Sequence, residues 1–403
     1  MNARFPLVLG AIVTVGAPLG AAEPTGIRVI GGSKATGSAQ AVVVDPTALA
    51  HTAQLLPIDS AGRIVGKDDP AAQVEKVLDN LAAALQEARA GLDRAVKVNV
   101  YVRRPAVIGE VHKAMARRFS GAVKPAITFV EGTLPHTDAL VAMDAVAAVG
   151  PDGPGEVKRL RSAALPGAKN TTHLAIMPAG PHVYISGQAV KGEDLATSTR
   201  KTMEGLRETL KFLGLNEAQV VHVKGFLKPM AAVAEAEKEI ARFFGDQPVP
   251  PMTFVEWTMA LPIEIELVVA APRAKDKAAE AIEFLTPPGV QASPVYSRIA
   301  RINQGKIVYI SGLFGKTAND ADAQIREVFA ALGELLTETG SDFRHLAKAT
   351  YYVADEETSR KLNELRPTYY DPRRPPAASK AVVPGVGVPG KTVTLDMIAV
   401  APR

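Results

Sequence analysis

The hydrophobic pattern of the chain switches between two periods, and this predicts its elements. Apolar residues first recur three and four positions apart, as on one face of a helix, at Val74, Val77, Leu78, Leu81 and Leu85. Between 96 and 103, valines alternate with polar residues, which is the period of a strand. We therefore predict a helix over 74–85, followed by a strand that buries one face.

The same order of elements returns further along the chain. A second helix is expected from about 107 to 119, and a closing strand over 263–269. Short runs of β-branched and aromatic residues precede the first helix, most clearly at 306–311, and a second helical stripe covers 325–336. Each unit therefore reads ββαβαββ, an α+β fold with both helices on one face of the sheet.

Two short motifs recur and show how many units there are. Val183-Tyr184-Ile185-Ser186-Gly187 returns at 308–312, and Thr128-Phe129-Val130-Glu131 returns at 253–256, both with a shift of 125 residues. A repeat at a fixed period indicates tandem copies of one structural unit. We predict three domains, at 38–149, 160–272 and 290–402, joined by a Gly/Pro-rich linker at 150–155 and a charged, then Pro-rich linker at 273–289.

Composition removes several kinds of chemistry. The 403 residues include no cysteine, which excludes disulfides, cysteine-ligated metals and thiol nucleophiles. A net charge of +4 from 46 basic and 42 acidic residues gives no basic footprint for nucleic acid. Seven histidines show no close metal-ligand spacing, and no strand-linked Gly-x-Gly-x-x-Gly or Gly-x-Ser-x-Gly is present, so no metal or cofactor is expected.

The N-terminus has the pattern of a secretory signal peptide. One positive charge at Arg4 precedes an uncharged, mostly apolar run from 5 to 22, which ends in small residues before Glu23. A buried N-terminal segment is the alternative, while Pro6 and Pro18 disfavour a membrane-spanning helix. We predict a leader over 1–22 and a periplasmic or secreted mature protein without a membrane anchor.

These motifs together resemble one known family. The Val-Tyr-Ile-Ser-Gly strand ending, the Pro-Pro run after the second helix, the acidic closing strand and Val295-Tyr296-Ser297-Arg298 are similar to the RidA family, also called YjgF or UK114 and labelled endoribonuclease L-PSP. The resemblance covers all three units and is weakest in the first, where Thr52-Ala53-Gln54-Leu55 replaces the strand-ending motif.

The resemblance implies a quaternary arrangement. Family members are small chorismate-mutase-like domains that form homotrimers with a ligand cleft at each interface. Three such domains on one chain imply a single-chain pseudo-trimer, because linkers of roughly 10 to 20 residues are long enough to cross between neighbouring units. Independent units joined like beads on a string are the alternative.

The resemblance also locates a substrate clamp that this chain lacks. In active members an arginine after the Pro-Pro step holds the substrate carboxylate as a bidentate fork. Apolar residues occupy that position here, each followed by a hydroxyl side chain: Ile127 and Thr128, Met252 and Thr253, Ala378 and Ser379. Tyr296 joins these as a candidate ligand contact. Lys124, Arg374 and Lys380 lie nearby as substitute cations, and solvated surface positions are the alternative explanation for them.

An acidic residue on each closing strand is the candidate catalytic group. The resemblance assigns the role of orienting the attacking water to Asp144, Glu266 and Asp396. Burial among apolar neighbours is expected to raise the pKa of each, as a general base requires. An ordinary strand carboxylate is the alternative.

Two functions remain open. The first is hydrolysis of imine- or enamine-type small molecules at the clefts between domains, on a substrate without the usual carboxylate. The second is a non-catalytic small-molecule-binding or structural module. RNA cleavage, which the family label suggests, has no support from charge or from a histidine-rich site.

Overall fold

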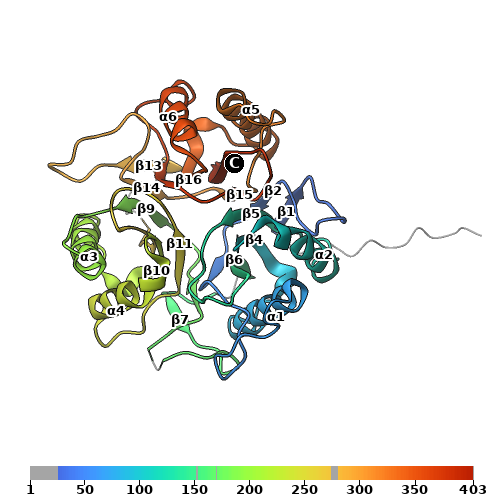
Figure 1. The fold of residues 1–403 in the computed structure, drawn as a ribbon. Helices are drawn as coiled ribbons and strands as arrows, with labels where there is room; N and C mark the ends of the chain where they lie inside the picture. Colours follow the sequence, from blue (N-terminus) through green and yellow to red (C-terminus); the bar gives the residue numbers. More distant parts are fainter. Residues whose placement is uncertain (1–25, 151–152, 169, 274–279, 403) are drawn as a thin grey trace, which may run out of the picture.

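The computed structural model describes all residues except 1–25, 151–152, 169, 274–279 and 403. The predicted leader, 1–22, therefore lies outside the described residues. Six helices form three pairs on the outside of a three-lobed ring (Figure 1). They are α1 (Pro70–Glu87) and α2 (Ile108–Arg118), α3 (Leu195–Phe212) and α4 (Val233–Phe244), and α5 (Ala321–Thr339) and α6 (Glu356–Leu365).

Three six-stranded sheets lie inside the helices and share one strand order. The first is β5 (Ala126–Glu131), β4 (Ala95–Val102), β6 (Val141–Gly150), β3 (Ala48–Thr52), β8 (Leu174–Met177) and β7 (Lys158–Leu160). The second is β11 (Met252–Glu256), β10 (Val220–Leu227), β12 (Ile263–Ala270), β9 (His182–Gln188), β14 (Ile299–Ile302) and β13 (Ile282–Leu285). The third is β17 (Ala377–Val382), β16 (Leu346–Val353), β18 (Val393–Ala401), β15 (Lys306–Ile310), β2 (Ala41–Val44) and β1 (Ile27–Ile30).

Short 3-10 turns precede the central strands and the second helices, or follow α6. They are η1 (Leu92–Arg94), η2 (Pro105–Val107), η3 (Glu217–Gln219), η4 (Met230–Ala232), η5 (Phe343–His345) and η6 (Arg366–Thr368). No helix in the described ranges is long and apolar enough to cross a membrane.

The predicted order ββαβαββ is confirmed in each repeat, with a further short strand in front of it. The first helix of each repeat begins after an aspartate whose carboxylate accepts a hydrogen bond from the N3 amide, at Asp69, Asp194 and Asp320. Two expectations need correction. The predicted linker at 273–289 contains β13, and β4 is buried on both faces because its polar residues point into the centre of the ring.

The repeats exchange their leading strands around the ring. The hairpin β7–β8 from the second repeat pairs with β3 of the first, and β13–β14 from the third pairs with β9 of the second. The N-terminal hairpin β1–β2 closes the circle by pairing with β15 of the third repeat. Every sheet is therefore completed by a neighbouring repeat, which makes the trimer-like arrangement a closed structure within one chain.

Candidate functional site

The three predicted carboxylates meet inside the ring. Asp144, Glu266 and Asp396 occupy equivalent positions on β6, β12 and β18, opposite Asn99, Lys224 and Thr350 on the neighbouring central strands. They line a cavity of about 80 Å³ together with buried lysines, histidines and tyrosines. The sequence thus identified three symmetry-related side chains, although it gave no sign of the partners described below.

Glu266 is bound by two groups of the third repeat. The Lys348 ammonium donates to Glu266 Oε2 at 2.6 Å, and Ser379 Oγ donates to the same oxygen at 2.6 Å. Burial by itself would raise the pKa of Glu266, but the ammonium groups of Lys348 and Lys224 outweigh it and hold that pKa below its usual value. The expected rise in pKa is therefore wrong for Glu266.

Asp396 has an equivalent partner across the next interface. Lys97 Nζ lies 2.8 Å from Asp396 Oδ1, and the same ammonium donates to Thr128 Oγ1 and to the carbonyl of Ile310. Burial again opposes ionisation of Asp396, but Lys97 and Lys224 lower its pKa. The Lys97 side chain is only 3% exposed, although its position on an alternating strand suggested contact with solvent. The expected rise is wrong here as well.

Asp144 breaks the threefold pattern. His222 occupies the position that Lys97 and Lys348 hold in the other repeats, as the strand registers show. Neutral donors bind the Asp144 carboxylate instead: Asn99 Nδ2 at 2.8 Å, Tyr101 OH at 2.7 Å and Thr253 Oγ1 at 3.0 Å. This interface therefore holds its carboxylate without a direct lysine contact.

All three carboxylates thus serve as contacts between repeats. Each accepts a hydrogen bond from a side chain of the following repeat in the ring, and each is buried. A carboxylate that is already engaged in this way must break a buried contact before it can orient a water molecule.

The three apolar clamp positions also lie where repeats meet. The Ile127 amide donates to Ser311 Oγ, the Ala378 amide donates to Ser186 Oγ, and the carbonyl of Met252 accepts from the Gln54 amide. The serines belong to the recurrent Val-Tyr-Ile-Ser-Gly motif, whose physical role is thus to dock each strand end on the next repeat. Gln54 performs this task in the first repeat, where its side-chain amide pairs with both backbone groups of Phe254.

A large cleft opens beside one of these positions. A cavity of about 700 Å³ lies between the first and second repeats, with Met252 in its wall. Its walls come from the segment after β3, from α4 and from the β7–β8 connection. Its lining is largely apolar, as in small-molecule sites generally.

The buried polar side chains that line this cleft, Asn80, Thr172 and His173, are engaged within the protein. His173 accepts from the Ser162 amide at Nδ1 and donates from Nε2 to the carbonyl of Pro166, so both ring nitrogens are occupied. Glu237 of α4 faces the cavity, and the surrounding walls remove enough water to raise the pKa of its carboxyl group. Lys238, the next residue of α4, also lines the cavity, so the two side chains present no net charge that would select an anion.

The suggested substitute cations do not reach the cleft. Lys124 donates to the carbonyl of Gly121, Arg374 pairs with Glu280, and Lys380 donates to Ser359 and Asn363. Tyr296 lies against the core of the third repeat beneath the Arg298 guanidinium, which is 5.1 Å from the ring centroid. None of these four residues lines the 700 Å³ cavity.

Glu264 is a candidate group that the sequence reasoning passed over. It lies two residues before Glu266 on the same strand face, and its Oε1 has no hydrogen-bond partner. Burial, with the nearby Glu266 charge, raises its pKa to about 7. Gly187 lies beside it, and a Cβ there would be 1.9 Å from that oxygen, so a larger residue would displace the Glu264 side chain. The alternating Ile-Glu-Ile-Glu of β12 could have identified Glu264 from the sequence. In the first and third repeats the equivalent positions are Ala142 and Thr394.

The fold and these interfaces define a class of protein: a ring of three α+β repeats with ligand-sized space between repeats. The chain belongs to the endoribonuclease L-PSP family, whose model matches residues 35–149, 164–271 and 289–401. The resemblance drawn from the sequence is thereby confirmed.

Individual relatives match single repeats. The chain is 34% identical over 92 residues to a RutC family protein of Pyrococcus abyssi. This matched region covers 23% of this chain and 72% of the relative. It is 29% identical over 114 residues to the protein DfrA of Myxococcus xanthus, covering 26% and 85%. Among solved structures it is similar to YyfB from Yersinia pestis, a Rid family protein of unknown function, with 26% identity, a TM-score of 0.29, and coverage of 31% of this chain and 99% of that chain.

Proposed function

We propose that this protein binds a small, predominantly apolar molecule without a carboxylate in the cleft between its first and second repeats. The observation that carries the proposal is the 700 Å³ cavity whose wall has Met252 where the family resemblance expects an arginine. A carboxylate ligand would lose part of its hydration there and meet Glu237 beside Lys238 instead of a bidentate guanidinium. The non-catalytic binding module is therefore favoured over hydrolysis at the three carboxylates of the ring centre, since these hold the repeats together.

Restoring the missing clamp tests this proposal. The chain starting at Glu23, the proposed mature terminus after export, is titrated calorimetrically with benzylamine, benzyl alcohol and benzoate, which share one ring and differ in the polar group. We expect benzoate to bind most weakly to the natural chain. We expect Met252→Arg to raise the benzoate affinity at least about tenfold, as a bidentate charged contact would.

A matched variant separates the clamp from a general change in charge. Glu235→Arg introduces the same side chain on α4 outside the cavity lining and should leave all three affinities unchanged. Absence of saturable binding for the whole panel at millimolar concentration, or equal gains in both variants, would refute the proposed ligand class.

Hydrolysis of imines or enamines is a second candidate, and Glu264 is the observation that favours it. In this reaction water adds to the C=N carbon and the nitrogen leaves as ammonia. A carboxylate with a pKa of about 7 can accept the proton of that water at neutral pH. The active form is the ionised one, so the rate should rise as the pH passes upward through about 7.

Ammonia release from a freshly generated enamine, with and without Glu264→Gln, measures this candidate. Loss of at least about tenfold in rate is expected, whereas the matched surface variant Glu338→Gln should behave as the natural chain. A rate equal to the buffer reaction, or one indifferent to Glu264→Gln, would exclude Glu264 as the base.

A further inference from the structure

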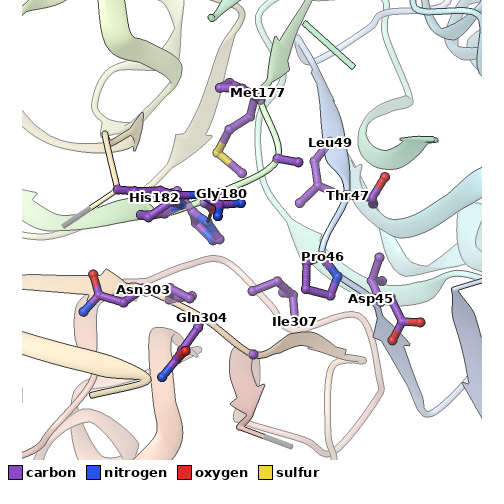
Figure 2. A pocket seen from close by; sticks show the side chains of 17 residues that line it. Asp45, Pro46, Thr47, Leu49, Met177, Gly180, His182, Asn303, Gln304 and Ile307 are labelled. Carbon is purple, nitrogen blue, oxygen red and sulfur yellow. Dashed lines mark hydrogen bonds between the residues drawn. The ribbon is translucent and has the colours of Figure 1, made fainter. Parts of the chain in front are cut away.

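A third cavity lies at the end of the ring, where the three exchanged hairpins leave their own repeats. Its walls come from the hinge segments 45–47, 178–181 and 303–305, one from each repeat, and from the strand ends beside them. Figure 2 shows side chains of the three segments facing one shared space. The cavity measures about 400 Å³ and is separate from the cleft, with which it shares no lining residue.

The buried residues that line this cavity are apolar except for His182, and the half-buried Thr47 adds a hydroxyl oxygen without a hydrogen-bond partner. Leu49, His182 and Ile307 occupy equivalent places in their sheets. On one side, each pairs with the last residue of an exchanged strand, and on the other side each pairs with a residue of a closing strand. All three are buried and line the cavity. Two repeats thus present an aliphatic side chain to this space, and the second repeat presents an imidazole.

The protein leaves one nitrogen of that imidazole without a partner. His182 Nδ1 lies 3.3 Å from the carbonyl oxygen of Gly180, which can only accept, so Nδ1 carries the hydrogen. Nε2 is buried with no hydrogen-bond partner, and the whole residue is 3% exposed. Burial lowers the pKa of His182 to about 4, so the ring is neutral near pH 7 and Nε2 offers a lone pair.

We propose that this axial cavity binds a small neutral molecule with an apolar body and one hydrogen-bond donor, which donates to His182 Nε2. The aliphatic side chains of Leu49 and Ile307 bury the apolar body, and the donor satisfies the unpaired nitrogen. Asp45 and Arg273 also line the cavity, but neither is buried, so an ion held at His182 would be desolvated without a buried partner of opposite charge.

The position of this site connects it to ring closure. Each hinge belongs to a different repeat, and each lies where the chain passes from one sheet into the next. A ligand in contact with all three hinges binds the closed ring and not the separated repeats, so it should raise the thermal midpoint of the whole chain.

Indole and benzofuran test the proposal, because they share size and shape while only indole has an N–H donor. Calorimetric titration of the natural chain should show indole binding about fivefold to tenfold more tightly than benzofuran, the contribution of one net hydrogen bond. His182→Leu reproduces the residue that the first repeat has at this position. It should reduce the ratio of the two affinities to about one while benzofuran still binds.

Two further variants locate the binding. Ala179→Trp on the exposed rim should weaken both compounds without altering the buried residues. Met252→Arg in the cleft should leave both affinities unchanged, so failure of the cleft proposal is distinguishable from failure of this one. The axial site is overturned if neither compound binds at millimolar concentration, if the preference for indole survives His182→Leu, or if Met252→Arg abolishes binding.

Discussion

Replacing Lys348 by methionine should lower the free energy of unfolding by about 3–5 kcal/mol, the usual effect of removing one partner of a buried ion pair. The substitution leaves the Glu266 carboxylate with Ser379 and without its ammonium, in a place where both charged side chains are 8% exposed. The shift in the denaturation midpoint, followed by circular dichroism in urea, measures the effect.

Two controls identify the cause of this loss. Adding Glu266→Gln to Lys348→Met removes the orphaned charge and should recover more than half of the lost stability. Lys211→Met breaks an exposed pair with Glu208 on α3 and should change stability by less than about 1 kcal/mol. A small effect of Lys348→Met, or no recovery in the double variant, would show that the central carboxylates do not hold the repeats together.

A disulfide across the ring-closing strands should stabilise the chain by about 2–4 kcal/mol. Val43 of β2 and Val308 of β15 are directly paired, and both contact the core of the third repeat. Because the natural chain has no cysteine, Val43→Cys with Val308→Cys introduces one unambiguous pair. The bond closes a loop that contains most of the chain, and this restricts the unfolded state strongly.

The expected result is a higher denaturation midpoint for the oxidised double variant than for the same protein after reduction. The two single cysteine variants report the cost of losing each valine side chain. An oxidised protein that unfolds at the midpoint of the reduced protein would mean that β2 does not hold the ring closed.

The helices and strands were predictable because each follows from a local pattern. The apolar stripe at 325–336 lies on α5, and the alternation at 263–269 lies on β12. The number of repeats was predictable from two motifs separated by 125 residues. These features depend on spacing within one segment or on copying between segments, and a sequence displays both.

The exchange of strands had no local signal. β14 and β15 are separated only by Asn303, Gln304 and Gly305, a pattern that suits a hairpin as well as a hinge. Strand pairing at a sheet edge is decided by which partner buries the strand, and here that partner is β9 of another repeat. The burial of Lys97 was also not predictable from its own strand. Alternation of polar and apolar residues shows that the strand has two different faces, but it does not show that other repeats cover both of them.

For the candidate site, the sequence predicted which residues take part but not which groups they contact. The equivalence of Asp144, Glu266 and Asp396 was visible on the closing strands, whereas their donors come from other repeats. The sign of a pKa shift depends on those donors, because Lys348 reverses the effect of burial on Glu266. Cavities between repeats depend on the same long-range packing.

The most direct test of ring closure by strand exchange compares two double-cysteine variants under oxidising conditions, both of which contain Val308→Cys. In the exchanged arrangement Val308 pairs with Val43, while Ala300 pairs with Tyr184 in another sheet. A local β14–β15 hairpin would instead bring Ala300 opposite Val308. We predict that mass spectrometry of the monomeric chain shows a disulfide in Val43→Cys/Val308→Cys and free thiols in Ala300→Cys/Val308→Cys. The reverse result would contradict the closed, strand-exchanged ring.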